Sequence, residues 1–238
     1  MSAAAKPRAI LLPHAPALVA VLLLLSFVAF WVPYFSQLSV ASRYVHFHVA
    51  TMLVWMCLLI VQPLLMRAGR RDVHRAIGKT TWLLMPLVLV SSVLLAHFRI
   101  SQPGAIDQPG MLQVLILQMF SPLLLAGFYA AALMRRREPA VHARWMLATA
   151  LPLIDPVIAR VLAFHLPKWA DAGDWLGPLI AMATLAIIIV AERQSSRGRH
   201  VFPIVFALVL LQLVLFYTLG TSAVWRTFAQ WFAALPLS

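Results

Sequence analysis

Three histidines lie at the ends of long apolar stretches, and they are the residues most able to bind a cofactor. They are His48, His97 and His165. Neutral imidazole is a common ligand of transition metals, and two imidazoles can ligate the iron of a haem. Brought together, the three would hold zinc or copper, or two of them would hold haem b. The alternative is that each is a polar tip at the edge of an apolar element, with no ligand.

Two charged residues lie within one of these apolar stretches. Arg160 precedes His165 by five residues and would neutralise a haem propionate or another anion beside the histidines. Asp155 precedes Arg160 by five, whereas charges pair along a helix at spacings of three or four. Each would therefore pair across helices. We expect either a structural polar clamp or a path for protons or ions.

The spacing of the polar residues in the second apolar stretch indicates which of them face inward. His46 and His48 are two residues apart, so on a helix they point in nearly opposite directions. Gln62 follows His48 by 14 residues, which returns it to nearly the same face, roughly 21 Å away along the axis. His48 is therefore the better candidate for the interior, with Gln62 deeper on the same face.

A second group of histidines accompanies basic residues at the opposite ends of the apolar stretches that end in His97 and His165. His74 is followed by Arg75 and Lys79, and His142 by Arg144. These cations would bind anionic lipid or a ligand that carries phosphate. Anchoring at a membrane surface explains them equally well. Gly78 would permit a tight turn or a close helix approach.

The elements that position these residues are membrane-spanning helices. The chain is 63% apolar and 11% charged, whereas a soluble domain carries about 25% charged residues. Apolar stretches long enough to cross a bilayer recur throughout. We therefore expect an all-α, polytopic membrane protein that forms a single domain over residues 1–238, with seven transmembrane helices in one bundle. The expected spans are 17–36, 43–66, 80–98, 111–134, 144–165, 176–192 and 201–219. The prolines within them predict kinks in unbroken helices.

The basic residues predict the orientation of this bundle. Fourteen of the 19 lysines and arginines fall on one side of the spans and four on the other, and Arg160 lies within a span. The positive-inside rule therefore places a short N-terminal segment, 1–16, in the cytoplasm. The same clustering into loops explains the net charge of +12 without a nucleic-acid partner. The tail 221–238 has aromatic residues at helical spacing and predicts an amphipathic helix in the outer interface.

The polar landmarks of residues 43–165 resemble a bacterial family of multi-helix membrane proteins with no assigned activity. The resemblance rests on His48, Gln62, the segment His74-Arg75-Ala76-Ile77-Gly78-Lys79, the segment His142-Ala143-Arg144-Trp145-Met146, and Arg160. Two departures are Lys79, where the family has arginine, and the aspartate at Asp155. The resemblance implies an all-helical protein of the bacterial inner membrane and supplies no activity.

Three hypotheses for the function follow. The first is a redox or electron-transfer protein that binds haem b or a transition metal near the outer face through His48, His97 and His165, with Arg160 holding an anionic group. The second is a small-solute transporter or sensor. Its polar path would begin beside His74 and His142 at the cytoplasmic ends of their spans and would run past Gln62, Asp155 and Gln212. The third is an accessory or assembly subunit that acts through a membrane protein partner or a homo-oligomer.

Overall fold

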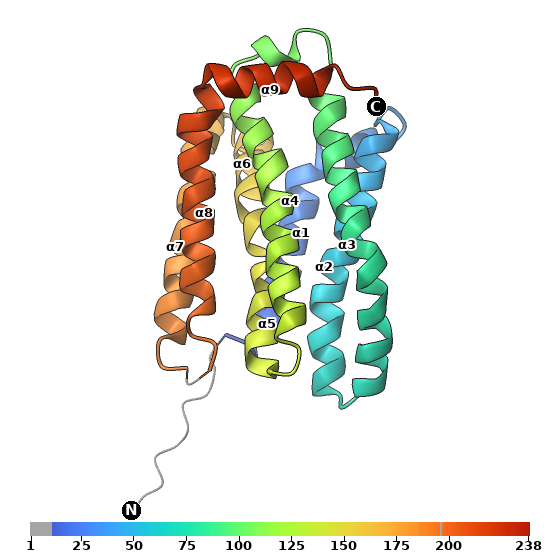
Figure 1. Cartoon of the computed structure of the whole chain (residues 1–238), viewed down its shortest axis with the longest axis vertical. Helices are drawn as coiled ribbons and strands as arrows, with labels where there is room; N and C mark the ends of the chain where they lie inside the picture. Colours follow the sequence, from blue (N-terminus) through green and yellow to red (C-terminus); the bar gives the residue numbers. More distant parts are fainter. Residues whose placement is uncertain (1–10, 196) are drawn as a thin grey trace, which may run out of the picture.

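The chain forms a bundle of nearly parallel helices that are joined by short loops. We describe a computed structural model, which places residues 11–195 and 197–238. This part of the chain contains helices and no strand (Figure 1). The α-helices are α1 (Ala15–Trp31), α2 (Arg43–Arg67), α3 (Arg71–Ile100), α4 (Met111–Met134), α5 (Pro139–Ala148), α6 (Ile154–His165), α7 (Gly173–Glu192), α8 (Val201–Thr218) and α9 (Ala223–Ala233). Short 3-10 turns follow as η1 (Phe35–Gln37), η2 (Ala105–Asp107), η3 (Leu151–Leu153), η4 (Pro167–Ala172) and η5 (Leu219–Thr221).

Six helical segments of the described chain are long and apolar enough to cross a membrane. They are Arg43–Arg67, Arg71–Ile100, Met111–Met134, Pro139–His165, Trp175–Glu192 and Val201–Thr221. The first predicted span, 17–36, corresponds to the shorter helix α1, which has 17 residues. At 1.5 Å per residue α1 is about 26 Å long, slightly less than a typical hydrocarbon core. The structure therefore supports a membrane protein with six candidate spans and one shorter apolar helix.

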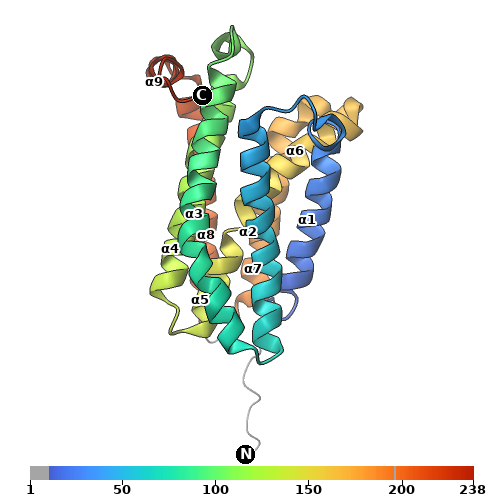
Figure 2. The ribbon, with the colours of Figure 1, turned by 90° about the vertical axis from the view of Figure 1, so that its right-hand side faces the viewer.

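The loops divide the bundle into two chemically different ends. At one end lie the connections α2–α3, α4–α5 and α7–α8, which together with the adjoining helix ends carry most of the arginines; we call this the basic end. At the opposite end, α9 lies across the bundle, nearly perpendicular to the other helices (Figures 1 and 2). We call this the α9 end. The two ends match the division of charge that the sequence predicts.

The predicted span 144–165 is not one helix, and this correction shapes the whole molecule. It is divided into α5 and α6 by η3. Pro152 and Pro156 have no N–H, so they cannot donate to the carbonyls one turn earlier. The hydroxyl of Thr149 donates to the Met146 carbonyl (2.6 Å) and accepts from Nε1 of the buried Trp55 (3.2 Å), which anchors the break against α2.

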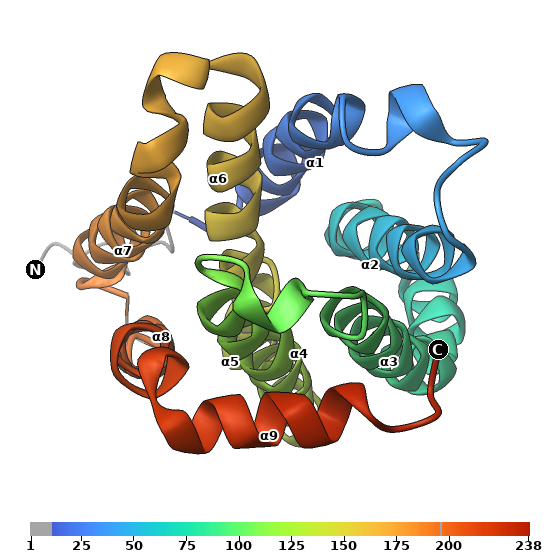
Figure 3. The same cartoon turned by 90° about the horizontal axis from the view of Figure 1, so that it is seen from above.

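The break moves the chain from the middle of the bundle to its edge. α5 packs against α4 and α8, and five of its ten residues are buried. α6 packs instead between α1 and α7, and two of its twelve residues are buried. Figure 3 shows this displacement when the bundle is viewed from the α9 end. The centre of the bundle is therefore filled by a helix at the basic end and left without one at the α9 end.

Two hydrophobic clusters hold the described residues together. The larger one fills the basic half and the middle of the bundle, around Trp55, Phe128 and Phe202. The smaller one lies beneath α9, where Trp225, Ala229 and Phe232 pack on α3 and α4. The predicted amphipathic tail is thus a helix, α9, and the Trp225 indole N–H donates to the Leu112 carbonyl (2.8 Å).

Candidate functional site

A cavity of about 360 Å³ occupies the α9 half of the bundle, where α6 has moved aside. Its deepest lining residues, Met56, Val88 and Leu125, are about 20 Å from the helix ends at the α9 end, counted at 1.5 Å per residue. Its volume is in the range of sites for small molecules. Most of the wall is apolar, and a few polar side chains converge on it: Ser26, His48, Ser92, Arg99, Gln118, Ser121, Asp155 and Arg160.

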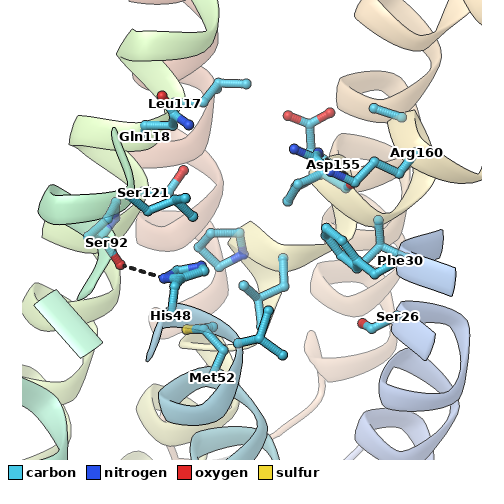
Figure 4. A pocket seen from close by; sticks show the side chains of 18 of the residues that line it. Ser26, Phe30, His48, Met52, Ser92, Leu117, Gln118, Ser121, Asp155 and Arg160 are labelled. Atoms are coloured by element: carbon cyan, nitrogen blue, oxygen red, sulfur yellow. Dashed lines mark hydrogen bonds between the residues drawn. The ribbon is translucent and has the colours of Figure 1, made fainter. Parts of the chain in front are cut away.

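His48 lines this cavity from α2, and His46 does not, as their spacing predicts. Nδ1 of His48 lies 3.4 Å from both the Ser91 and the Ser92 hydroxyls on α3. These long contacts orient the imidazole against α3, and Figure 4 shows the one to Ser92. His46 turns toward the α1–α2 connection, where its Nδ1 lies 2.9 Å from the Tyr34 hydroxyl.

Arg160 and Asp155 line the cavity from α6, opposite Ser92, Gln118 and Ser121 (Figure 4). The Arg160 guanidinium donates to the Pro156 carbonyl (3.1 Å) and lies 5.0 Å from the centre of the Phe30 ring on α1. A cation over an aromatic face is favourable, and more so away from water. The Arg160 charge is therefore held at the cavity wall about 7.5 Å from the end of α6.

Asp155 is held against α7 through a glycine. A Cβ atom at Gly177 would collide with the Asp155 carboxylate. Glycine at this position lets α7 approach the polar segment of α6 closely. The small residue thus contributes to the shape of the cavity although its own sequence context gives no signal for it.

The wall formed by α4 includes an unsatisfied acceptor. Gln118 Oε1 is buried and has no hydrogen-bond partner among the described residues. Its neighbour Ser121 accepts a hydrogen bond from the Gln212 amide on α8 (2.7 Å). Buried acceptors without partners are uncommon in folded proteins because losing water costs about 1–3 kcal/mol. Gln118 thus lines the cavity with an amide whose oxygen has no hydrogen-bond partner among the described residues.

The predicted cofactor site of three histidines is not assembled in the described residues. His48 lines the cavity, whereas His97 is buried beneath α9, with Nδ1 2.5 Å from the Ser238 hydroxyl and its ring against Phe232. His165 is exposed and donates to the Val28 carbonyl (2.8 Å). No group of three histidine, cysteine or carboxylate side chains that would hold a metal occurs in residues 11–195 and 197–238.

The expected polar path from the basic end to the cavity is also interrupted. With its amide oriented by the hydrogen-bond network, Gln62 donates to His74 Nδ1 (2.5 Å) and accepts from the Gly78 N–H (3.1 Å). Gly78 lies within α3 and makes no turn, and a Cβ atom there would meet the Gln62 amide at 3.9 Å, an ordinary contact. His142 lies 2.8 Å from the Ala132 carbonyl, which closes the α4–α5 connection. Gln62, His74 and His142 do not line the cavity.

Arg144 corrects a further expectation, that it binds lipid. Its side chain is fully buried, and it forms an ion pair with Glu192 at the end of α7. It also donates to the Ser195 hydroxyl (2.6 Å) and the Ala140 carbonyl (2.8 Å). Glu192 in turn accepts from the Leu11 N–H (2.9 Å). Sequence reasoning missed Glu192, although an acid directly after a long apolar stretch is an available signal.

Arg75 and Lys79, by contrast, are exposed at the basic end. They remain the residues of that group able to meet lipid headgroups.

Comparison with protein-family models, with curated proteins and with solved structures finds no match to this chain.

Proposed function

We propose that this protein is a membrane-embedded transporter or sensor that binds a small amphipathic molecule in the cavity beside α6. The single observation that carries this proposal is the cavity itself. Its wall is predominantly apolar, and its few polar groups gather on two facing sides, around His48 and Arg160. Such a combination fixes the orientation of a small molecule by its head and encloses its apolar body.

The packing of the bundle supports loading from the α9 end. The cavity is lined near that end by Phe35, Arg99 and Gly173, while large buried side chains fill the opposite half. Charge asymmetry supports a cytoplasmic location of the basic end. The ligand would then arrive from the outer side of a bacterial inner membrane, and anionic lipids would contact Arg75 and Lys79. Membership of the family that the motifs resemble is part of this proposal.

The proposed function does not include a haem or metal held jointly by His48, His97 and His165. The three side chains lie in a cavity wall, beneath α9 and on the exposed surface, respectively. His48 is the one member of this set that faces the cavity. Its Nδ1 contacts the hydroxyls of Ser91 and Ser92, and of these two serines Ser92 also lines the cavity.

The test is thermal stabilisation by 1-decanol, a neutral amphiphile. A ligand that binds only the folded protein raises its stability by RT ln(1 + [L]/Kd). We expect 1-decanol to raise the melting temperature of the purified protein, and Met52→Trp or Leu53→Trp to abolish this rise by filling the cavity. Met134→Trp is the matched control, because Met134 is 77% exposed and lies away from the cavity. An equal rise in all variants would overturn the proposal.

A further inference from the structure

The described polar side chains of the cavity wall have a net positive charge. Among them, two arginines, Arg99 and Arg160, line the cavity together with one carboxylate, Asp155. Arg160 lies well inside α6, where an ionised side chain in hydrocarbon costs several kcal/mol. Such residues in membrane proteins face a cavity and mark a ligand or ion pathway. An anion in this cavity would lower the cost of both partly buried cations.

The head of the ligand, and not its chain, determines the specificity. The chain contributes little to discrimination between ligands, because lipid tails are as apolar as the side chains of the wall. The head is different, since charges interact more strongly away from water than in it. Discrimination therefore depends on the polar groups around His48 and Arg160.

A second observation describes the head further. Gln118 Oε1 is a buried acceptor without a partner among the described residues, and Gln118 lines the same cavity. An acidic group alone does not satisfy it, because an anionic oxygen is itself an acceptor. A hydroxyl or N–H near the acidic group would donate to Gln118 while the acidic group meets Arg160.

On the basis of the proposed function, we infer that the ligand is a hydroxylated amphipathic acid. Its acidic group is held by Arg160 and Arg99, a neighbouring hydroxyl donates to Gln118, and its chain extends toward Met52 and Met56. The same chemistry is found in a free hydroxy fatty acid and in a single-chain lipid with a phosphate head and a glycerol hydroxyl. The test includes one compound of each kind.

The experiment compares melting-temperature shifts caused by amphiphiles that share a ten-carbon chain. The compounds are 1-decanol, decanoate, 3-hydroxydecanoate, 1-decanoyl lysophosphatidic acid and decyltrimethylammonium, each referenced to the cavity-filling variant Met52→Trp. We expect 3-hydroxydecanoate or the lysophosphatidic acid to bind most tightly, and the one that does identifies the source. Decanoate follows, and the cation binds most weakly.

Two substitutions separate the contributions of the head. Arg160→Gln should weaken binding of decanoate by about tenfold, with little effect on 1-decanol, and Arg160→Lys should restore part of the loss. Gln118→Leu should remove a preference of about fivefold for the hydroxylated acid over decanoate. Arg99→Gln is a second charge variant, in case Arg160→Gln does not fold.

The outcomes distinguish this inference from the proposed function. Binding of 1-decanol in the cavity with no preference among the heads would overturn the inference alone. Equal binding of decanoate and 3-hydroxydecanoate would overturn the role of Gln118. A failure of 1-decanol to stabilise the wild type more than Met52→Trp would instead overturn the proposed function.

Discussion

At the scale of single residues, the sequence is informative where a position on one helix decides the outcome. The opposite directions of His46 and His48 follow from their spacing, and the structure places them accordingly. The predicted convergence of His48 with His97 and His165 is not found. Convergence depends on which helices are neighbours and on how far each side chain lies from the end of the bundle, and the spacing along one helix gives neither. The pair Arg144–Glu192 could not be predicted for the same reason, because its members are 48 residues apart and lie on different helices.

This ion pair leads to a prediction for stability. Arg144 and Glu192 are 0% and 1% exposed, so removing one partner leaves the other charged and buried. Arg144→Gln or Glu192→Gln should cost about 3–5 kcal/mol of unfolding free energy, measured by denaturation in mixed micelles. The exposed pair Arg135–Glu138 is the control, and Arg135→Gln should cost less than about 1 kcal/mol. Equal costs for Arg144→Gln and Arg135→Gln would contradict the structural role of the buried pair.

At the scale of the elements, hydropathy located six of the seven expected spans as long apolar segments. It did not locate helix ends, because helices continue past the apolar stretch. α3 begins at Arg71, nine residues before the predicted span, and includes His74 and Gly78. Hydropathy also could not distinguish a proline that a helix accommodates, such as Pro63 in α2, from Pro152, which lies in the 3-10 turn η3 between α5 and α6. That difference depends on partners in other helices, here Trp55.

The spans themselves can be tested through the single cysteine, Cys57. Cys57 lies within an apolar stretch of the sequence, and its side chain is exposed near the middle of α2. If α2 spans the bilayer, this thiol faces lipid, where it does not form the reactive thiolate. We expect a membrane-impermeant maleimide to leave Cys57 unlabelled in intact membranes and to label it after denaturation in detergent.

Two cysteine variants in a Cys57→Ser background serve as controls and report the orientation. Gln102→Cys, in the α3–α4 loop at the α9 end, should be labelled in intact cells. Arg136→Cys, at the basic end, should be labelled only after the membrane is opened. Labelling of Cys57 as fast as Gln102→Cys would show that α2 does not lie in hydrocarbon.

At the scale of the whole molecule, the cavity exists because one span changes position halfway through the bundle. α5 fills the centre at the basic end, and α6 leaves it at the α9 end. Composition and periodicity predict a helical bundle, but they contain no information about such a displacement. The sequence therefore predicts the class of the fold and several residues of the site, including His48, Asp155 and Arg160, and it does not predict the space between them.

The most direct test of the central claim is the position at which a photoreactive ligand attaches. A ten-carbon alcohol with a diazirine at the end of its chain would be activated in membranes that contain the protein, and labelled peptides would be identified by mass spectrometry. We predict label on α2 and α4 around Met52, Met56 and Leu125, deep in the cavity, and its loss in Met52→Trp but not in Met134→Trp. Label confined to lipid-facing positions such as Leu123 and Met134, and unchanged by Met52→Trp, would contradict the account.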